Sequence, residues 1–167
     1  MSQNSLAIFD PLTADWFRRT LGEPTAVQDA AWPAISSGGH TLVSAPTGTG
    51  KTLSAFLVFI DRFLAEARSG TLKEELKLIY ISPLKSLAGD IRENLRRPLN
   101  GILEEERKQN SSAESTFSKL TIAIRTGDTP QKERRNMIKH PPHILITTPE
   151  SLFLMLTSQS GKKILCT

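Results

Sequence analysis

The stretch Thr41-Leu-Val-Ser-Ala45-Pro-Thr-Gly48-Thr-Gly50-Lys51-Thr52 decides the fold, because an apolar run of strand length stops at a glycine-rich turn that opens into a helical pattern. Glycines allow the backbone to curl, so that successive N–H groups point into one concavity at the positive end of the following helix. The sequence therefore predicts a strand over 41–45, a phosphate-binding loop and a helix. The residues expected to surround a triphosphate are Thr47, Gly48, Thr49, Gly50, Lys51 and Thr52.

Two of these residues carry the chemistry of the loop. Lys51 would place its charge against the β- and γ-phosphates, and the Thr52 hydroxyl would bind a Mg²⁺ ion that keeps most of its water. The alternative is a plain strand-to-helix turn in which Lys51 is a solvated charge. The apolar run before the loop and the helix after it favour phosphate binding.

Composition sets limits on the class of protein. The length of 167 residues, with 38% hydrophobic and 23% charged residues, fits one soluble globular domain. A net charge of +4 permits a polyanionic partner without requiring one. No apolar run is long enough to span a bilayer and no signal peptide is evident, so we expect a cytoplasmic protein without membrane contact. A single cysteine and three histidines without ligand spacing predict no structural metal.

The rest of the chain alternates between helical and strand patterns. Strands are expected at 76–81, 120–124 and 143–147, and helices at 25–35, 53–64, 85–95, 129–138 and after Pro149. The polar segment 104–116 predicts a surface helix end followed by a mobile loop. This alternation predicts an α/β fold, in which a parallel sheet has helices on both faces.

Gln28 lies in the first turns of the helix expected before the phosphate-binding loop. Its side-chain amide can accept a hydrogen bond from the N6 amino group of adenine and donate one to N7. An isolated glutamine is more often a solvated polar residue, and it is the position of Gln28 near the loop that favours base recognition.

Polar segments follow the three predicted strands, where ligands bind in parallel sheets. They are Ser82-Pro83-Leu84-Lys85-Ser86, Arg125-Thr126-Gly127-Asp128-Thr129 and Thr147-Thr148-Pro149-Glu150-Ser151. Hydroxyls, cations and helix N-termini bind phosphodiester oxygens without reading the bases. The alternative is that Thr129 and Thr148 only cap their helices.

These motifs together resemble superfamily 2 helicases. Gly22-x-Pro-Thr-x-x-Gln28 is similar to the Q motif, Ala45–Thr52 to motif I, Ser82–Ala88 to motif Ia, and the two later segments to motifs Ib and Ic. Between Phe9 and Leu156, the residues of these segments are similar to those of the large-helicase-related (Lhr) family.

The resemblance implies the first of two RecA-like domains of an ATP-dependent helicase. It implies ATP and Mg²⁺ at the phosphate-binding loop, and a second RecA-like domain of the parent chain as a partner in cis. It also implies a single-stranded or forked nucleic acid, DNA in preference to RNA, across the polar segments. The residues expected to contact it are Pro83, Lys85, Ser86, Arg125, Thr126, Gly127, Asp128, Thr148, Pro149 and Glu150.

The chain departs from the family pattern at one point, because it contains no Asp-Glu pair and hence no motif II. We therefore expect residues 1–167 to be a RecA-like domain that stops before motif II, with an incomplete sheet and no hydrolytic machinery of its own. Two other functions stay open at this point. They are a P-loop kinase of a small metabolite and a binding module without catalysis.

Overall fold

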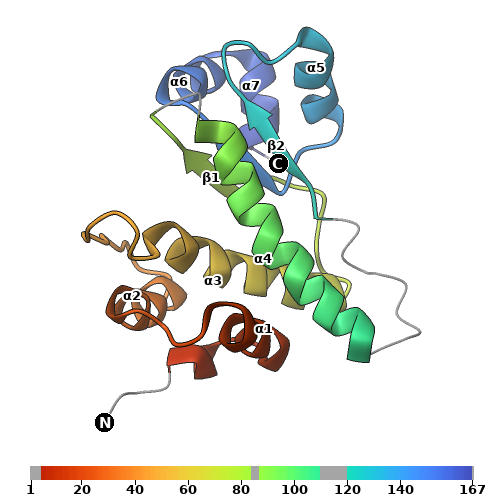
Figure 1. The fold of residues 1–167 in the computed structure, drawn as a ribbon. Coiled ribbons are helices and arrows are strands. Elements are labelled where there is room, and N and C mark those ends of the chain that lie inside the picture. Colours follow the sequence, from red (N-terminus) through yellow and green to blue (C-terminus); the bar gives the residue numbers. More distant parts are fainter. Residues whose placement is uncertain (1–4, 84–86, 110–119, 167) are drawn as a thin grey trace. The chain divides into compact units, whose positions relative to one another are not determined.

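The computed structural model describes residues 5–83, 87–109 and 120–166 (Figure 1). The chain divides into two units, Met1–Thr71 with Leu95–Phe117, and Leu72–Asn94 with Ser118–Thr167. Helix α4 (Leu87–Gln109) contributes its first part to the second unit and the rest to the first. None of the described helices is both long and apolar enough to cross a membrane.

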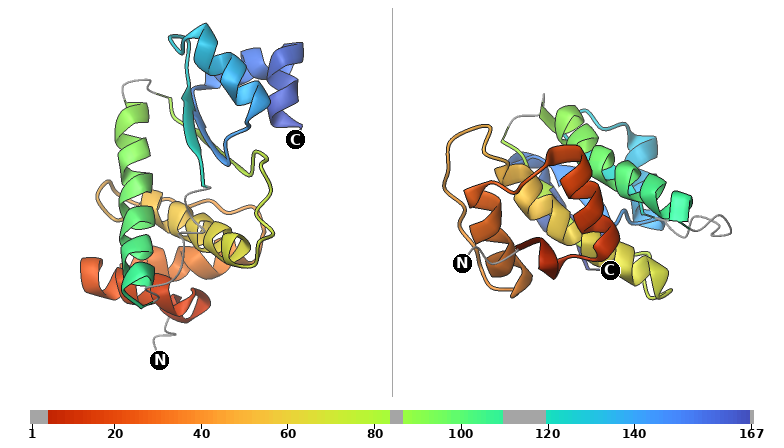
Figure 2. Two further views of the ribbon diagram at one scale, coloured as in Figure 1. Left: turned by 90° about the vertical axis from the view of Figure 1, so that its right-hand side faces the viewer. Right: turned by 60° about the horizontal axis from the view of Figure 1, so that its bottom comes forward.

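The first unit is helical. It contains a short 3₁₀ helix, η1 (Ser5–Ile8), and the helices α1 (Pro11–Leu21), α2 (Ala26–Ser36) and α3 (Lys51–Arg68). Figure 2 shows α2 beside α3, and these two helices pack against each other. Apolar residues of α3 recur at helical spacing and are buried, as the sequence predicted; they include Phe56, Leu57, Ile60, Phe63 and Leu64.

Trp32 lies at the centre of the core of this unit. Its side chain is fully buried, and its ring makes edge-to-face contacts with Phe9 at 4.9 Å and with Phe17 at 5.3 Å. Such aromatic pairs add about 0.5–1.5 kcal/mol each to the burial of their area. The core of the first unit therefore anchors α2, the helix that carries Gln28.

The second unit contains a parallel sheet of three short strands, β1 (Leu78–Ile81), β2 (Ile122–Arg125) and β3 (Ile144–Thr147), in the order β1-β3-β2. The central strand β3 is buried at every position. Helices α5 (Gln131–Lys139), α6 (Pro149–Thr157) and α7 (Gln159–Leu165) lie on one side of the strands (Figure 2). Their shared core consists of Met137, Leu145, Met155 and Ile164. The predicted α/β fold with a parallel sheet is confirmed.

The strand predicted over 41–45 does not form. These residues have no regular secondary structure, and Leu42 is 94% exposed. A strand needs a neighbour that pairs with its N–H and C=O groups, and no described residue pairs with this segment. The prediction of a strand over 41–45 is therefore wrong for this structure.

Two helix boundaries also differ from the prediction. Helix α4 continues past the predicted end at 95 to Gln109, through Pro98, so that polar residues 104–109 are helical. The predicted mobile loop lies largely outside the described residues. Thr129 does not cap α5, because Pro130 occupies the N-cap position and makes no side-chain hydrogen bond there.

Candidate functional site

The loop before α3 forms a turn that opens on the N-terminus of that helix. Gly48 and Gly50 have φ values of +82° and +83°, a left-handed conformation that glycine adopts without steric cost. Gly50 is the N-cap of α3 and provides no side-chain cap, so no side chain of the cap competes for the first amides of the helix. Unpaired amides and the helix dipole favour an anion at this point.

The predicted phosphate-binding side chains lie in this loop and in the first turn of α3. The Lys51 ammonium donates to the carbonyl oxygen of Ala45 and, at 2.5 Å, to that of Pro46. Lys51 is thus folded into the loop itself. Thr47 and Thr52 are exposed. The exposed Thr52 hydroxyl is an oxygen donor of the kind that Mg²⁺ prefers.

The structure brings Gln28 to the phosphate-binding loop. Gln28 is 4% exposed, and its Nε2 lies 2.6 Å from the point where a Cβ on Gly50 would stand. Its Oε1 accepts from the Thr25 N–H at 2.9 Å, and Thr25 Oγ1 accepts from the Gln28 N–H at 3.3 Å, which forms the capping box of α2. Thr25 Oγ1 also donates to the Thr49 carbonyl oxygen at 2.9 Å. Thr25 therefore caps α2 and also ties this helix to the loop.

The C-terminal ends of the three strands are level with one another. In the register of the sheet, Thr147 of β3 stands beside Ile81 of β1 and beside Arg125 of β2. The predicted alignment of the strand ends is confirmed, and nucleic-acid contact along it stays a prediction. The segments that begin at this edge contain Pro83, Thr126–Asp128 and Thr148–Glu150. Lys85 and Ser86, predicted for the same edge, lie outside the described residues.

Arg125 carries its guanidinium into the interior at this edge. The residue is 8% exposed, and its Nη1 is buried without a hydrogen-bond partner among the described residues. Burial, and in second place the charge of Arg134, lowers the pKa of Arg125 from its usual value. The Arg125 backbone is held by Thr147, whose Oγ1 donates to the Arg125 carbonyl oxygen at 2.7 Å. Arg125 is thus a buried cation whose Nη1 has no hydrogen-bond partner among the described residues.

Two side chains hold the turn after β2. Thr129 Oγ1 accepts from the Thr126 N–H at 2.8 Å and donates to the Ile124 carbonyl oxygen at 3.3 Å. Arg134 of α5 donates to the carbonyl oxygens of Thr126, Gly127 and Thr129 at 3.3, 2.7 and 2.7 Å. The sequence did not single out Arg134, whose only signal was a positive charge in the second turn of a helix.

Thr148 caps α6, which was the alternative interpretation of this residue. Its Oγ1 accepts from the Ser151 N–H at 3.4 Å. The Glu150 carboxyl has a pKa below its usual value, because it accepts hydrogen bonds from its own backbone N–H and from the Thr148 side chain. A charged carboxylate stabilises a helix N-terminus and repels a phosphate. Glu150 therefore fits the start of α6 better than a direct phosphate contact.

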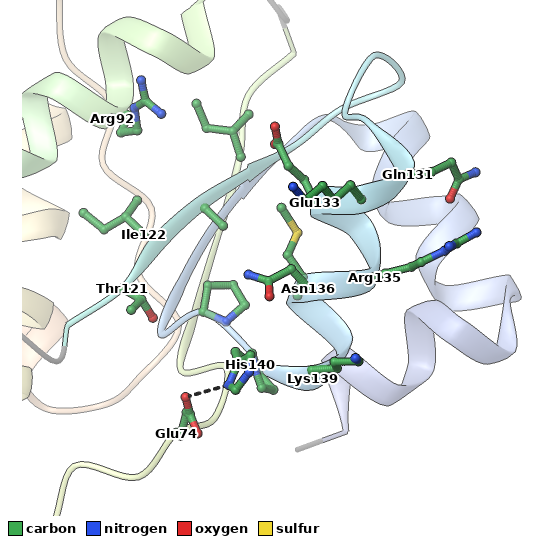
Figure 3. A pocket seen from close by; sticks show the side chains of 16 residues that line it. Glu74, Arg92, Thr121, Ile122, Gln131, Glu133, Arg135, Asn136, Lys139 and His140 are labelled. Carbon is green, nitrogen blue, oxygen red and sulfur yellow. Dashed lines mark hydrogen bonds and ion pairs between the residues drawn. The ribbon is translucent and has the colours of Figure 1, made fainter.

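A cavity of about 870 Å³ lies in the second unit between β2 and α5 (Figure 3). Ile122 and Ile124 contribute to it from β2, and Asn136 and Met137 contribute from α5. Among the residues predicted to bind nucleotide or nucleic acid, none of those that the structure describes lines this cavity. It is not the site that the motifs predicted.

The comparisons with known proteins support the motifs. The family model described as DEAD/DEAH box helicase matches residues 25–166. The Lhr helicase/probable uracil glycosylase of Mycolicibacterium smegmatis is 50% identical over 153 residues, covering 92% of this chain and 10% of the relative. The Lhr helicase/uracil glycosylase of Escherichia coli is 46% identical over 157 residues, with the same two coverages of 92% and 10%. The chain spans about a tenth of the length of these relatives.

A solved structure agrees with these relatives. The structure of Mycobacterium smegmatis helicase Lhr bound to ssDNA and AMP-PNP matches with a TM-score of 0.86 at 45% identity, over 98% of this chain and 20% of that chain. The RecA-like fold predicted from the motifs is confirmed by this likeness. Since the family model matches from the N-cap of α2 to the C-cap of α7, the chain belongs to the DEAD/DEAH box helicase family, with the Lhr helicases as its relatives within that family.

Proposed function

We propose that this chain is the part of an Lhr-type, ATP-dependent helicase that binds ATP and single-stranded nucleic acid. The observation that carries the proposal is the packing of Gln28 against Gly50, which joins a base-reading amide to a phosphate-binding loop. The solved Lhr relative, which is bound to ssDNA and AMP-PNP, supports both ligands. Family membership removes the small-metabolite kinase as an alternative.

The nucleotide would be held from two sides. The backbone N–H groups of residues 47–52 would bind the phosphates, and Lys51 would exchange its two loop carbonyls for the β- and γ-phosphates. The Gln28 amide would bind the adenine edge through Nε2 and through the second lone pair of Oε1. Thr52 would be the one described side chain of this loop to bind Mg²⁺, which when bound neutralises phosphate charge.

The nucleic acid would lie along the level ends of β1, β3 and β2. Backbone amides of 126–128, Thr148 and Glu150, together with the hydroxyls of this edge, would face its phosphates beside Pro83 and Pro149, and Lys85 and Ser86 would extend the same edge. The buried Arg125 would add positive charge to this edge without direct contact. Contacts of this kind do not depend on base sequence. We further propose DNA in preference to RNA, in line with the ssDNA-bound relative.

Hydrolysis would need groups that this chain does not contain. It has no Asp-Glu pair, and in the proposed helicase a second RecA-like domain of the parent protein would close over the nucleotide. A general base typically contributes about 10²–10⁴ in rate, and an arginine finger about 10³–10⁵. The chain alone should therefore bind ATP with little turnover.

The test compares ligand binding by the wild-type chain and two lysine variants. Lys51→Ala should abolish binding of a fluorescent AMP-PNP derivative in an anisotropy titration, because the loop loses its only lysine. Lys108→Ala, an exposed residue of α4, removes the same charge outside the loop and should bind like wild type. Unchanged AMP-PNP affinity of Lys51→Ala would reject the nucleotide site.

Nucleic-acid binding is measured separately, with labelled single strands of two unrelated sequences as DNA and as RNA. The proposal expects similar affinities for both sequences and a preference for DNA. The absence of binding to every strand would reject the nucleic-acid site, and tighter binding of RNA would reject the preference.

A further inference from the structure

Arg134 is bound to the backbone of the turn after β2 in an unusual way. Its Nη2 donates to the carbonyl oxygens of two successive residues, Thr126 at 3.3 Å and Gly127 at 2.7 Å, and its Nε donates to that of Thr129 at 2.7 Å. Bonds from a charged, planar guanidinium are stronger than neutral ones and fix the direction of their acceptors. One side chain of α5 thus sets the orientation of the peptide groups of this turn.

Because the peptide bond is planar, the direction of these carbonyls also fixes the direction of the neighbouring N–H groups. In a trans peptide unit the C=O of one residue and the N–H of the next point in opposite directions. Because Arg134 draws the carbonyls of Thr126 and Gly127 toward itself, the N–H groups of Gly127 and Asp128 are directed away from its guanidinium. Successive N–H groups that point to one side form a concavity that binds anions.

Among the described residues, a side chain at Gly127 would have room. A Cβ added to Gly127 would meet no heavy atom within 4 Å, and Gly127 does not have a positive φ value. Neither backbone conformation nor packing therefore requires glycine at this position. A ligand backbone that approaches the turn closely would require it.

We infer that Arg134 is a positioning residue for nucleic acid, which holds the turn so that the N–H groups of Gly127 and Asp128 face a phosphate; the inference rests on the proposed nucleic-acid site. The side chain acts through the turn and does not itself neutralise the phosphate. Thr129 completes the arrangement by accepting from the Thr126 N–H.

The role as a positioning residue differs from direct contact in its salt dependence. A cation that neutralises one phosphate of a single strand contributes about 0.7 to the slope of log K against log salt. Arg134→Ala should therefore weaken binding of single-stranded DNA by about tenfold, the equivalent of about 1.4 kcal/mol, and leave that slope unchanged. Arg134→Lys keeps the charge and loses the planar fork, so it should weaken binding as well.

Arg135→Ala is the matched control. It removes the same charge from the next position of α5, where the side chain is exposed. It should change neither the affinity nor the exchange rates of the turn.

Hydrogen exchange tests the turn without any ligand. The Thr126 and Thr129 amides donate to Thr129 Oγ1 and to the Thr126 carbonyl oxygen, so Arg134→Ala should accelerate their exchange while the amides of β3 stay protected. Protection of β3 also shows that the variant is folded.

The outcomes separate the two proposals. If the wild-type chain binds no single strand, both the proposed nucleic-acid site and the inference about Arg134 are rejected. If wild type binds and Arg134→Ala exchanges faster and binds more weakly at an unchanged slope, the inference is supported. Rescue by Arg134→Lys, a slope lowered by about 0.7, unchanged exchange or unchanged affinity would each overturn the inference alone.

Discussion

Replacement of Gly50 by alanine probes the junction between α2 and the phosphate-binding loop. Gly50 has a φ of +83°, and a Cβ there would stand 2.6 Å from Gln28 Nε2 and 3.2 Å from its Cδ. Gly48 has nearly the same conformation, with a φ of +82°, and its Cβ would meet nothing within 4 Å. Both alanine variants carry the cost of the left-handed conformation, and Gly50→Ala differs from Gly48→Ala in the collision with Gln28 and in its position as the N-cap of α3.

The magnitudes follow from that difference. A left-handed conformation costs an L-residue about 1–2 kcal/mol, and both variants should lose this amount. Gly50→Ala must also displace the Gln28 amide, whose Oε1 accepts from the Thr25 N–H at 2.9 Å. Loss of a helix cap costs about 0.5–2 kcal/mol. Gly50→Ala should therefore lower the free energy of unfolding by about 0.5–2 kcal/mol more than Gly48→Ala does.

Tryptophan fluorescence is a suitable assay, because both tryptophans, Trp16 and Trp32, are buried in the first unit. For a chain of this size the extra loss corresponds to about 1–8 °C in melting temperature. In a Gln28→Ala background the part of the extra cost that comes from the collision should disappear, which a double-mutant cycle measures. Equal losses for Gly48→Ala and Gly50→Ala in the wild-type background would refute the contact between Gln28 and the loop.

Three further changes test other parts of the chain. Gln28→Ala should weaken ATP more than GTP in a titration with both nucleotides, because its amide matches adenine; equal losses would show that Gln28 does not read the base. Gly127→Ala should leave the melting temperature nearly unchanged and weaken single-strand binding, since only a closely approaching ligand would meet the new Cβ; unchanged affinity would argue against that approach. Burial raises the pKa of Asp61, which accepts from the Asp10 N–H at 3.1 Å, so its ionisation lowers stability as the pH rises through that pKa. Asp61→Asn keeps an acceptor oxygen, so its free energy of unfolding should exceed that of wild type at neutral pH. Denaturant titrations at several pH values should show that this difference disappears below the ordinary pKa of an aspartate.

Features that depend on near neighbours in the chain could be predicted from the sequence. The glycines of the loop and the start of α3 each involve residues within a few positions of one another. The three strands of the sheet were also predictable, because their apolar runs alternate with helices and βαβ units are parallel. Local pattern and topology rules therefore account for the fold of the second unit.

Features that depend on distant partners were missed. Strand formation over 41–45 requires a paired neighbour, and a sequence pattern reports propensity alone. Thr129 was expected to cap α5, but its hydroxyl accepts from the Thr126 N–H. The binding of turn carbonyls by Arg134 was not predicted, because charged residues on helices are usually solvated and these carbonyls lie on the preceding turn.

If Gln28 reads the base, the capping box of α2 would link base recognition to the fold of the first unit. Gln28 Oε1 already accepts one hydrogen bond, from the Thr25 N–H, and a carbonyl oxygen has two lone pairs. An adenine amino group would take the second, so the same oxygen would cap the helix and read the base. The Thr25 hydroxyl, in turn, donates to the Thr49 carbonyl oxygen of the loop. A nucleotide that binds both the loop and Gln28 would therefore tighten one continuous chain of hydrogen bonds from the base to the phosphates, and a nucleotide with another base would bind only at the phosphate end of it.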